Sequence, residues 1–352
     1  MRQIPTSSWV KISKKKPCFP VSHLLQEYLN HFQRSAPFAL RYDDLLDYQE
    51  AFPLQDAAGE DTLWDWVVYP QREWDEITNQ LTKIYAYLKT PDAPEYTDHL
   101  YISRVEFCNF GNSKPFRIRV VNRYNDNHDY YYVKQADASR IYGLELEHVL
   151  APNRIDFLVR AGGDTLIEEH IAGIPGDVYL QNRTLRDEHT NVRIAKEFVK
   201  FSERCFAKLL GDMRSYNYVV VITQDFDMEQ IRVRAIDFDQ QSYEGRVEVY
   251  LPQFYEENRT MLEHVWDILE PDTIRQYQKE ERGLMARRLK AGWSRVDDLL
   301  FCMEHDMIST DDRVETLRQG LARYHHDQIF LESRTMGQLT RQHLTSMVFK
   351  GG

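Results

Sequence analysis

Asp212, Asn217 and Asp237 lie within one stretch of the chain, from Leu210 to Asp239. Asp212 and Asn217 are five positions apart on an irregular segment, and two β-like runs follow, the second of which ends at Asp237. In phosphoryl transfer, one carboxylate orients the acceptor hydroxyl, while an amide and a second carboxylate hold the magnesium ion that bridges the phosphates. These residue types, in this order, are therefore candidates for a phosphoryl-transfer site.

The segment resembles the catalytic and metal-binding loops of the protein-kinase-like superfamily, particularly its aminoglycoside-phosphotransferase-like branch. The resemblance implies that Asp212 is the catalytic residue, which orients and deprotonates the acceptor. It implies that Asn217 and Asp237 are the Mg²⁺ ligands. A single aspartate or asparagine is more often a helix or turn cap. The interpretation therefore depends on the order of elements over about residues 99 to 245.

The segment departs from the family pattern at two positions. Leu210 stands where the family has a histidine that braces the loop, and this change removes no phosphate or metal ligand. Asp239 replaces a glycine and is either a further ligand or an exposed turn residue. Both departures leave open a pseudokinase, in which the same fold binds partners.

A small β lobe is predicted upstream, because the apolar positions alternate from His99 onward. Two strands flank the turn 109–114, which contains Gly111, and a third strand ends at Lys134. The resemblance implies that this turn covers the phosphates of ATP and that Lys134 grips them. Gly111 is a single glycine where protein kinases carry several, which favours the small-molecule branch.

The next segment, Ala138 to Leu150, is predicted to be a short helix that carries two candidate partners for the lysine. The resemblance implies a carboxylate partner for Lys134 on this helix. Glu145 fits better than Glu147, which stays an alternative. A hairpin around the Gly162-Gly163-Asp164 turn follows.

The hairpin leads into the run EEHIAGIPGD, which is similar to the hinge of the phosphotransferase branch. The resemblance implies that the carbonyl of Glu169 and the N–H of Ile171 hold the adenine edge. Residues 191–210 then form an amphipathic pattern typical of a long core helix, which would deliver Asp212 at its C-terminal end. Helical patterns dominate from Tyr250 onward.

The predicted fold class is α+β: a protein-kinase-like two-lobed fold with a small antiparallel β lobe, a helical C-lobe and a helical N-terminal extension. The predicted parts are a mainly helical extension (1–95), an N-lobe (99–170) and a C-lobe with the catalytic and metal loops (171–352). In the extension, helices are expected at 22–32, with Ser22 as N-cap, and at 72–88.

Composition narrows the function classes. The 352 residues carry a net charge of -11, which argues against a general nucleic-acid binder. The four cysteines are far apart and form no zinc-ligand spacing. The sequence contains no apolar run of the ~20 residues needed to span a bilayer, and the N-terminus lacks a signal-peptide pattern. A cytoplasmic protein without membrane attachment is expected.

The predicted activity is transfer of a phosphoryl group from ATP, with Mg²⁺, to a hydroxyl of a small molecule, with a protein acceptor as the second option. A rival from another class is a two-metal nuclease that uses Asp212, Asp225 and Asp237. The sequence does not identify the acceptor, the oligomeric state or the role of residues 1–95.

Overall fold

The computed structural model describes residues 16–56, 58–90, 96–110, 113–181, 188–225 and 228–350. The fold is α+β, with a mixed sheet of eight strands, a second sheet of three strands and ten α-helices within these ranges. The chain divides into two compact units. The sheet unit contains residues 16–138 and Ile155–His170, and the helical unit contains Ser139–Arg154 and residues 171–350.

The eight-stranded sheet has the strand order β1-β7-β8-β6-β5-β4-β3-β2. Strand β1 is parallel to β7, and all other neighbours are antiparallel. The strands are β1 (Ser35–Ala36), β2 (Glu50–Gln55), β3 (Asp61–Val68), β4 (Leu100–Phe107), β5 (Phe116–Asn122), β6 (His128–Gln135), β7 (Phe157–Arg160) and β8 (Thr165–Glu169). The predicted meander and hairpin thus form the centre of a larger sheet.

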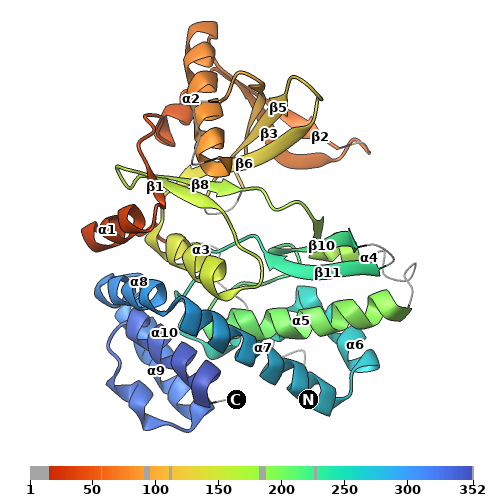
Figure 1. Cartoon of the computed structure of the whole chain (residues 1–352), viewed down its shortest axis with the longest axis vertical. Coiled ribbons are helices and arrows are strands. Elements are labelled where there is room, and N and C mark those ends of the chain that lie inside the picture. Colours follow the sequence, from red (N-terminus) through yellow and green to blue (C-terminus); the bar gives the residue numbers. More distant parts are fainter. Residues whose placement is uncertain are drawn as a thin grey trace. The chain divides into compact units, whose positions relative to one another are not determined.

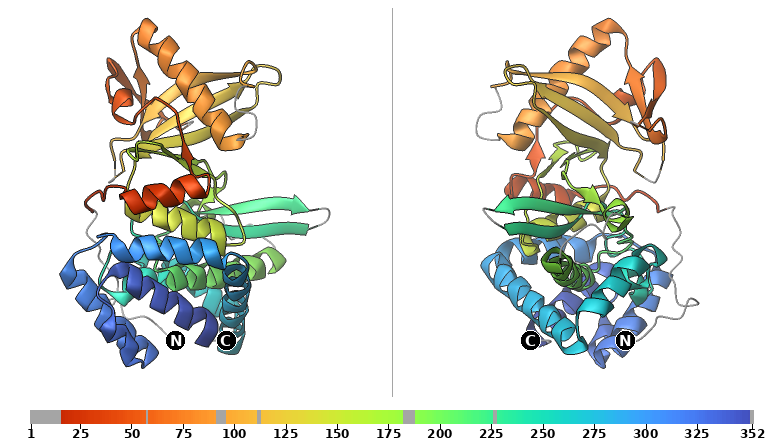
Figure 2. Two further views of the ribbon diagram at one scale, coloured as in Figure 1. Left: turned by 60° about the vertical axis from the view of Figure 1, so that its left-hand side comes forward. Right: turned by 90° about the vertical axis from the view of Figure 1, so that its right-hand side faces the viewer.

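Helix α2 (Gln71–Lys89) packs along one face of this sheet (Figures 1 and 2). Its buried residues, among them Leu81 and Ile84, share one core with Phe116 and Ile118 of β5. The alternation predicted for β5 is confirmed, because the intervening arginines are only partly buried. Apolar burial on this face stabilises the sheet unit.

The N-terminal residues are not a mainly helical extension. Two helices are present as predicted, α1 (His23–His31), capped by the Ser22 side chain, and α2. However, β1 pairs with β7, and the hairpin β2–β3 pairs with β4, so this part of the chain completes the sheet. Strand β3 lacks a regular alternation of buried apolar residues, because Leu63 and Trp66 are exposed and Val67 is buried, so its sequence does not predict a strand.

A short strap, residues 16–19, holds the junction after β6. Asp137 accepts a hydrogen bond from the main-chain N–H of Phe19 at 2.8 Å and forms a salt bridge with Lys16. The N–H of Ala138 donates to the carbonyl of Phe19 at 2.9 Å. The strap therefore fixes the point where helix α3 begins.

The helical unit contains α3 (Ala138–Leu150), which had been expected to belong to the N-lobe. The other helices are α4 (Gly176–Gln181), α5 (Glu188–Lys208), α6 (Arg259–Ile268), α7 (Pro271–Ala291), α8 (Trp293–His305), α9 (Asp311–His325) and α10 (Met336–Thr345). Strands β9 (Ile174–Pro175), β10 (Tyr218–Asp225) and β11 (Met228–Ala235) form the small sheet, in the order β11-β10-β9. The β10–β11 hairpin lies along α5 (Figures 1 and 2).

Short turns of 3₁₀ or π helix complete the chain at Asp43–Leu46, Val247–Tyr250, Pro252–Phe254, Glu256–Asn258, Gln328–Glu332 and Ser346–Lys350. Among the helices of the described ranges, none combines the length and the apolar content that crossing a bilayer requires.

Candidate active site

The chain turns sharply after α5 and brings Asp212 out of the helix axis. Leu209 and Asp212 both have left-handed backbone conformations, with φ of 53° and 58°. Between them, Leu210 is fully buried and bridges to Gln241. Left-handed backbone is costly for residues other than glycine and is found where the surrounding structure enforces it, often at functional sites. The turn is thus held in place by the buried side chain of Leu210.

Glycine is required at position 211, because neighbouring atoms leave no room for a side chain there. A Cβ at this position would lie 2.9 Å from Cγ1 of Val249 and 3.2 Å from the carbonyl oxygen of Gln240. Its N–H donates to that same carbonyl at 3.2 Å. Close approach of two backbone segments thus explains the glycine before Asp212.

Two side chains hold the loop from Asp212 to Asn217. The side-chain amide of Asn217 donates to the main-chain carbonyl of Asp212 at 2.7 Å. The N–H of Asp212 donates to the hydroxyl of Tyr255 at 3.0 Å, and this hydroxyl donates to the carbonyl of Val249 at 2.7 Å. The loop geometry therefore depends on side chains as well as on the backbone turn.

The hairpin brings Asn217 and Asp237 to the same end. Tyr218 and Ala235 are paired across β10 and β11, and the N–H of Ile236 donates to the carbonyl of Asn217 at 3.0 Å. Asn217 immediately precedes β10, and Asp237 follows β11 by two positions. The predicted metal ligands are thus neighbours at the open end of the hairpin.

Arg140, on the first turn of α3, contacts the acids that follow β11. Its Nη2 donates to Oδ1 of Asp237 at 2.9 Å, and its Nε donates to Oδ1 of Asp239 at 2.8 Å. The N–H of Asp239 also donates to Oδ1 of Asp237, at 3.0 Å. Asp239 is therefore part of the acidic cluster rather than an exposed turn residue. No sequence pattern had indicated Arg140.

Asp212 titrates close to neutrality. Burial raises its pKa to about 6, the positive charge of Arg214 opposes this rise, and the negative charge of Asp237 adds to it. Nε of Arg214 donates to Oδ1 of Asp212 at 2.7 Å, and Arg214 also forms a salt bridge with Glu257 at 3.1 Å. Asp212, Asn217 and Asp237 thus belong to one site. Arg214 was not among the predicted site residues, although its position two residues after Asp212 indicates that it lies near that carboxylate.

The donor chemistry suits magnesium. Asp237 supplies carboxylate oxygen and Asn217 supplies amide oxygen, and Oδ1 of Asn217 has no hydrogen-bond partner among the described residues. In the part of the chain that the structure describes, no group of three or more His, Cys, Asp or Glu side chains could hold a metal by itself. Mg²⁺ is commonly bound through one or two carboxylates, with phosphates and water completing its shell. The set therefore fits a magnesium–nucleotide complex better than a metal held by protein alone.

Lys134 is buried in the sheet unit and forms a salt bridge with Glu168 of the same unit. Its Nζ lies 2.7 Å from Oε2 of Glu168, on the neighbouring strand β8. The expected partner, Glu145, is fully buried in a salt bridge with Arg295. Glu147, the alternative, forms a salt bridge with Lys208 of α5. Both glutamates of α3 thus have cationic partners within the helical unit.

Glu169 and Ile171, which are predicted to hold the adenine edge, lie at the end of β8 and two positions after it. Glu169 ends β8, its N–H donates to the carbonyl of Asp156 at 3.0 Å, and its carboxylate lies 3.6 Å from Lys89. Ile171 is buried, and its N–H has no main-chain partner in the described ranges. Gly111 lies outside the described residues.

The three acids of the nuclease alternative do not form one site. Asp225 pairs with Met228 at the turn end of the hairpin, whereas Asp212 and Asp237 lie at its open end. Eight strand residues separate the two ends, which corresponds to roughly 26 Å. Two-metal catalysis needs carboxylates gathered around ions ~4 Å apart.

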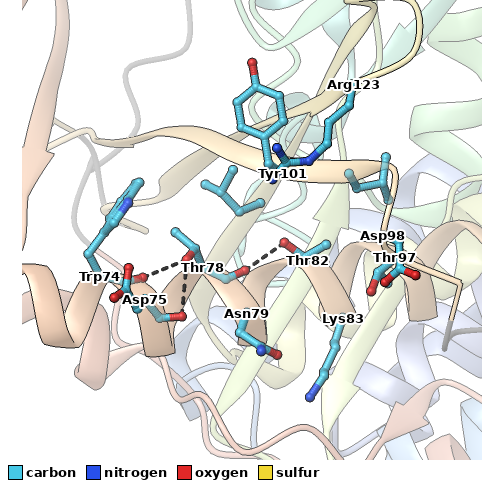
Figure 3. A pocket seen from close by; sticks show the side chains of 12 residues that line it. Trp74, Asp75, Thr78, Asn79, Thr82, Lys83, Thr97, Asp98, Tyr101 and Arg123 are labelled. Atoms are coloured by element: carbon cyan, nitrogen blue, oxygen red, sulfur yellow. Dashed lines mark hydrogen bonds between the residues drawn. The ribbon is translucent and has the colours of Figure 1, made fainter.

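A cavity of about 530 Å³ lies in the sheet unit between α2 and β4 (Figure 3). Lys83 and Arg123 line it together with Asp75 and Asp98. The hydroxyl of Thr78, which also lines it, donates to main-chain carbonyls of α2. None of the predicted site residues lines this cavity, so it is distinct from the cluster around Asp212.

The functional interpretation rests on the cluster of Asp212, Asn217 and Asp237 in the helical unit. Comparison of the sequence with models of known protein families and with curated proteins finds no match.

Proposed function

We propose that the protein is a protein-kinase-like phosphotransferase that uses ATP and Mg²⁺ and transfers the γ-phosphoryl group to a hydroxyl of a small molecule, with a protein as the second class of acceptor. The order of elements supports this: the meander β4–β6, α3, the hairpin β7–β8, α5, the Asp212 loop and the hairpin β10–β11. The observation that carries the proposal is the convergence of Asp212, Asn217 and Asp237.

Asp212 is the proposed general base. A carboxylate with a pKa of about 6 is ionised at neutral pH, yet it is more basic than an ordinary aspartate, so it accepts a proton more readily. Arg214, which touches Asp212, supplies positive charge beside the reacting hydroxyl. The loop contact from Asn217 to the Asp212 carbonyl holds the base in place.

Asn217 and Asp237 would hold the magnesium ion, which neutralises phosphate charge when bound. The proposal assigns Lys134 to the α and β phosphates, because it is a buried ammonium group oriented by Glu168. It assigns the adenine edge to the carbonyl of Glu169 and the N–H of Ile171.

Nucleotide titration tests the proposal directly. ATP binding to the wild type should strengthen with Mg²⁺, and Asp237→Ala should lose the Mg²⁺-dependent part. Asp212→Asn should bind Mg²⁺–ATP normally and lose ATP turnover. Asp272→Asn, at an exposed site on α7, serves as the control and should match the wild type. A wild type that binds ATP equally well with and without Mg²⁺ would contradict the proposal.

The second candidate is a pseudokinase, and the contact of Arg140 with Asp237 and Asp239 favours it, because a cation already occupies the metal-binding acids. Under this candidate, the nucleotide or a partner protein binds without chemistry. Mg²⁺-independent nucleotide binding, together with an absence of turnover, would support it over the phosphotransferase.

A further inference from the structure

Helix α3 packs closely against the segment after β11. The hydroxyl of Ser139 donates to the carbonyl of Gln241 at 2.8 Å. One turn later, a Cβ at Gly143 would lie 3.1 Å from Cβ of Gln241 and 3.2 Å from Cβ of Phe238, so the helix backbone approaches this segment closely. Arg140 lies between these two contacts and faces the acids. The position of its guanidinium group is therefore fixed by the helix.

One guanidinium contacts two carboxylates at this point. The side chain of Arg140 is only 3% exposed and bonds both Asp237, which is 31% exposed, and Asp239, which is 14% exposed. Removal of one member of a largely buried charged group leaves uncompensated charge, which is destabilising. Arg140 thus contributes positive charge beside both carboxylates.

We propose that Arg140 is a resident counter-ion of the metal-binding acids, which holds Asp237 and Asp239 in position and competes with the divalent cation for Asp237. This inference rests on the proposed function, because it takes Asp237 as the metal ligand. A metal ion that approaches Oδ1 of Asp237 meets the positive charge of Nη2, whereas the Nε contact with Asp239 can persist. Arg140 is therefore a positioning residue that sets the metal affinity.

Competition between Arg140 and the metal ion predicts that metal affinity rises when the charge of Arg140 is removed. Coulomb repulsion between a divalent ion and a guanidinium a few ångströms away weakens metal binding, and solvent screens it only in part, because the side chain of Arg140 is 3% exposed and that of Asp237 is 31% exposed. Replacement of Arg140 by a neutral residue of similar length should therefore tighten divalent-cation binding at least tenfold. A purely structural arginine predicts the reverse, because loss of its support would disorder the ligands.

The experiment measures Mn²⁺ affinity as the gain in affinity for a non-hydrolysable ATP analogue when Mn²⁺ is added, by calorimetry, together with thermal unfolding in EDTA and in saturating Mg²⁺. Arg140→Gln should bind Mn²⁺ at least tenfold more tightly than the wild type. It should unfold at a lower temperature than the wild type in EDTA, and Mg²⁺ should raise its unfolding temperature more than that of the wild type. Arg140→Lys, which keeps the charge, should stay within about threefold of the wild-type affinity.

Arg341→Gln is the matched control. Arg341 also bridges two carboxylates, those of Asp297 and Glu304, within the same unit but on α10 and α8. This variant should lose thermal stability without any change in Mn²⁺ affinity. An equal gain in affinity for both variants would overturn the inference, because the effect would then be general.

Asp239→Asn provides a second test that does not depend on the folding of Arg140→Gln. It removes one of the two carboxylates that bind Arg140, so the guanidinium should bind Asp237 more strongly and metal affinity should fall at least tenfold. Unchanged metal affinity would count against competition between Arg140 and the metal.

Unchanged or weaker Mn²⁺ binding in folded Arg140→Gln would also overturn the inference, provided that Asp237→Ala abolishes Mn²⁺ binding. If Asp237→Ala has no effect, the metal-ligand assignment fails instead, and the proposed function fails with it.

Discussion

The side-chain amide of Asn217 donates a hydrogen bond to the main-chain carbonyl of Asp212 at 2.7 Å, so a predicted metal ligand also fixes the loop that carries the predicted base. The donor is the amide nitrogen, which leaves the amide oxygen for a metal. One residue can thus serve both functions, and substitutions can separate them.

Asn217→Ala should lower ATP turnover by about 10²-fold or more, because it removes an oxygen ligand and frees the Asp212 loop. Asn217→Asp keeps an oxygen ligand but replaces the donor with a carboxylate that faces the carbonyl. It should retain Mg²⁺ affinity while losing turnover. The Mg²⁺ dependence of the rate measures both effects, and identical behaviour of the two variants would argue against the dual role.

The dependence of kcat/KM on pH should follow Asp212. Because a general base must be ionised, activity should fall as the pH drops through about 6, the pKa of this carboxyl, and should level off above it. Arg214→Gln should move the midpoint to higher pH, because the positive charge of Arg214 lowers the Asp212 pKa. A midpoint near 4 in the wild type, the ordinary value of an aspartate, would contradict a raised Asp212 pKa as the cause of the pH dependence.

Asp212→Asn should stabilise the protein at neutral pH. The folded-state pKa is raised above the ordinary 3.8, so folding favours the protonated carboxyl, and stability decreases as the pH rises from about 4 to 6. The neutral amide avoids this cost, by about 1–3 kcal/mol at pH 7.5. Urea unfolding of wild type and variant at pH 7.5 and pH 4 measures the difference, which should shrink at the lower pH.

Glu168, rather than Glu145, should affect nucleotide binding. Glu168→Gln removes the carboxylate that orients Lys134, so it should weaken ATP binding in the manner of Lys134→Met. Glu145→Gln leaves Arg295 without its buried partner, which should cost about 2–4 kcal/mol of stability but leave ATP affinity unchanged below the unfolding transition. Calorimetric titration with ATP, paired with urea unfolding, distinguishes them. The opposite ranking would support Glu145 as the carboxylate that positions Lys134.

The helical unit should lose stability in acid through His343. This fully buried imidazole lies 2.9 Å from the carbonyl of Phe206 and 2.9 Å from His325, and burial lowers its pKa from 6.5 to about 3. The neutral ring is favoured in the fold, so its contribution is complete above pH 6.5 and is lost as the pH falls toward 3. His343→Gln should be less stable at pH 7.5 and show a weaker pH dependence between 6.5 and 4. An unchanged slope in urea unfolding would refute this.

Much of the local structure could be predicted from the sequence. The helices at 22–32, 72–88, 138–150 and 191–210 are confirmed within a few residues, and so is the β10–β11 hairpin. These elements have a strong apolar period of 3.6 or 2, which local sequence carries. The hairpin also fixes the approach of Asn217 to Asp237, because its register pairs Tyr218 with Ala235.

The tertiary structure decided which charged groups meet. Glu145 and Glu147 were both predicted as candidates for Lys134, and within the helical unit packing of α3 also brings them to Arg295 and Lys208, which no sequence pattern had indicated. The same packing brings Arg140 to Asp237 across 97 positions of the chain. Salt-bridge partners are chosen by distance and burial in the folded protein, and sequence spacing encodes such distances only within a single helix or hairpin.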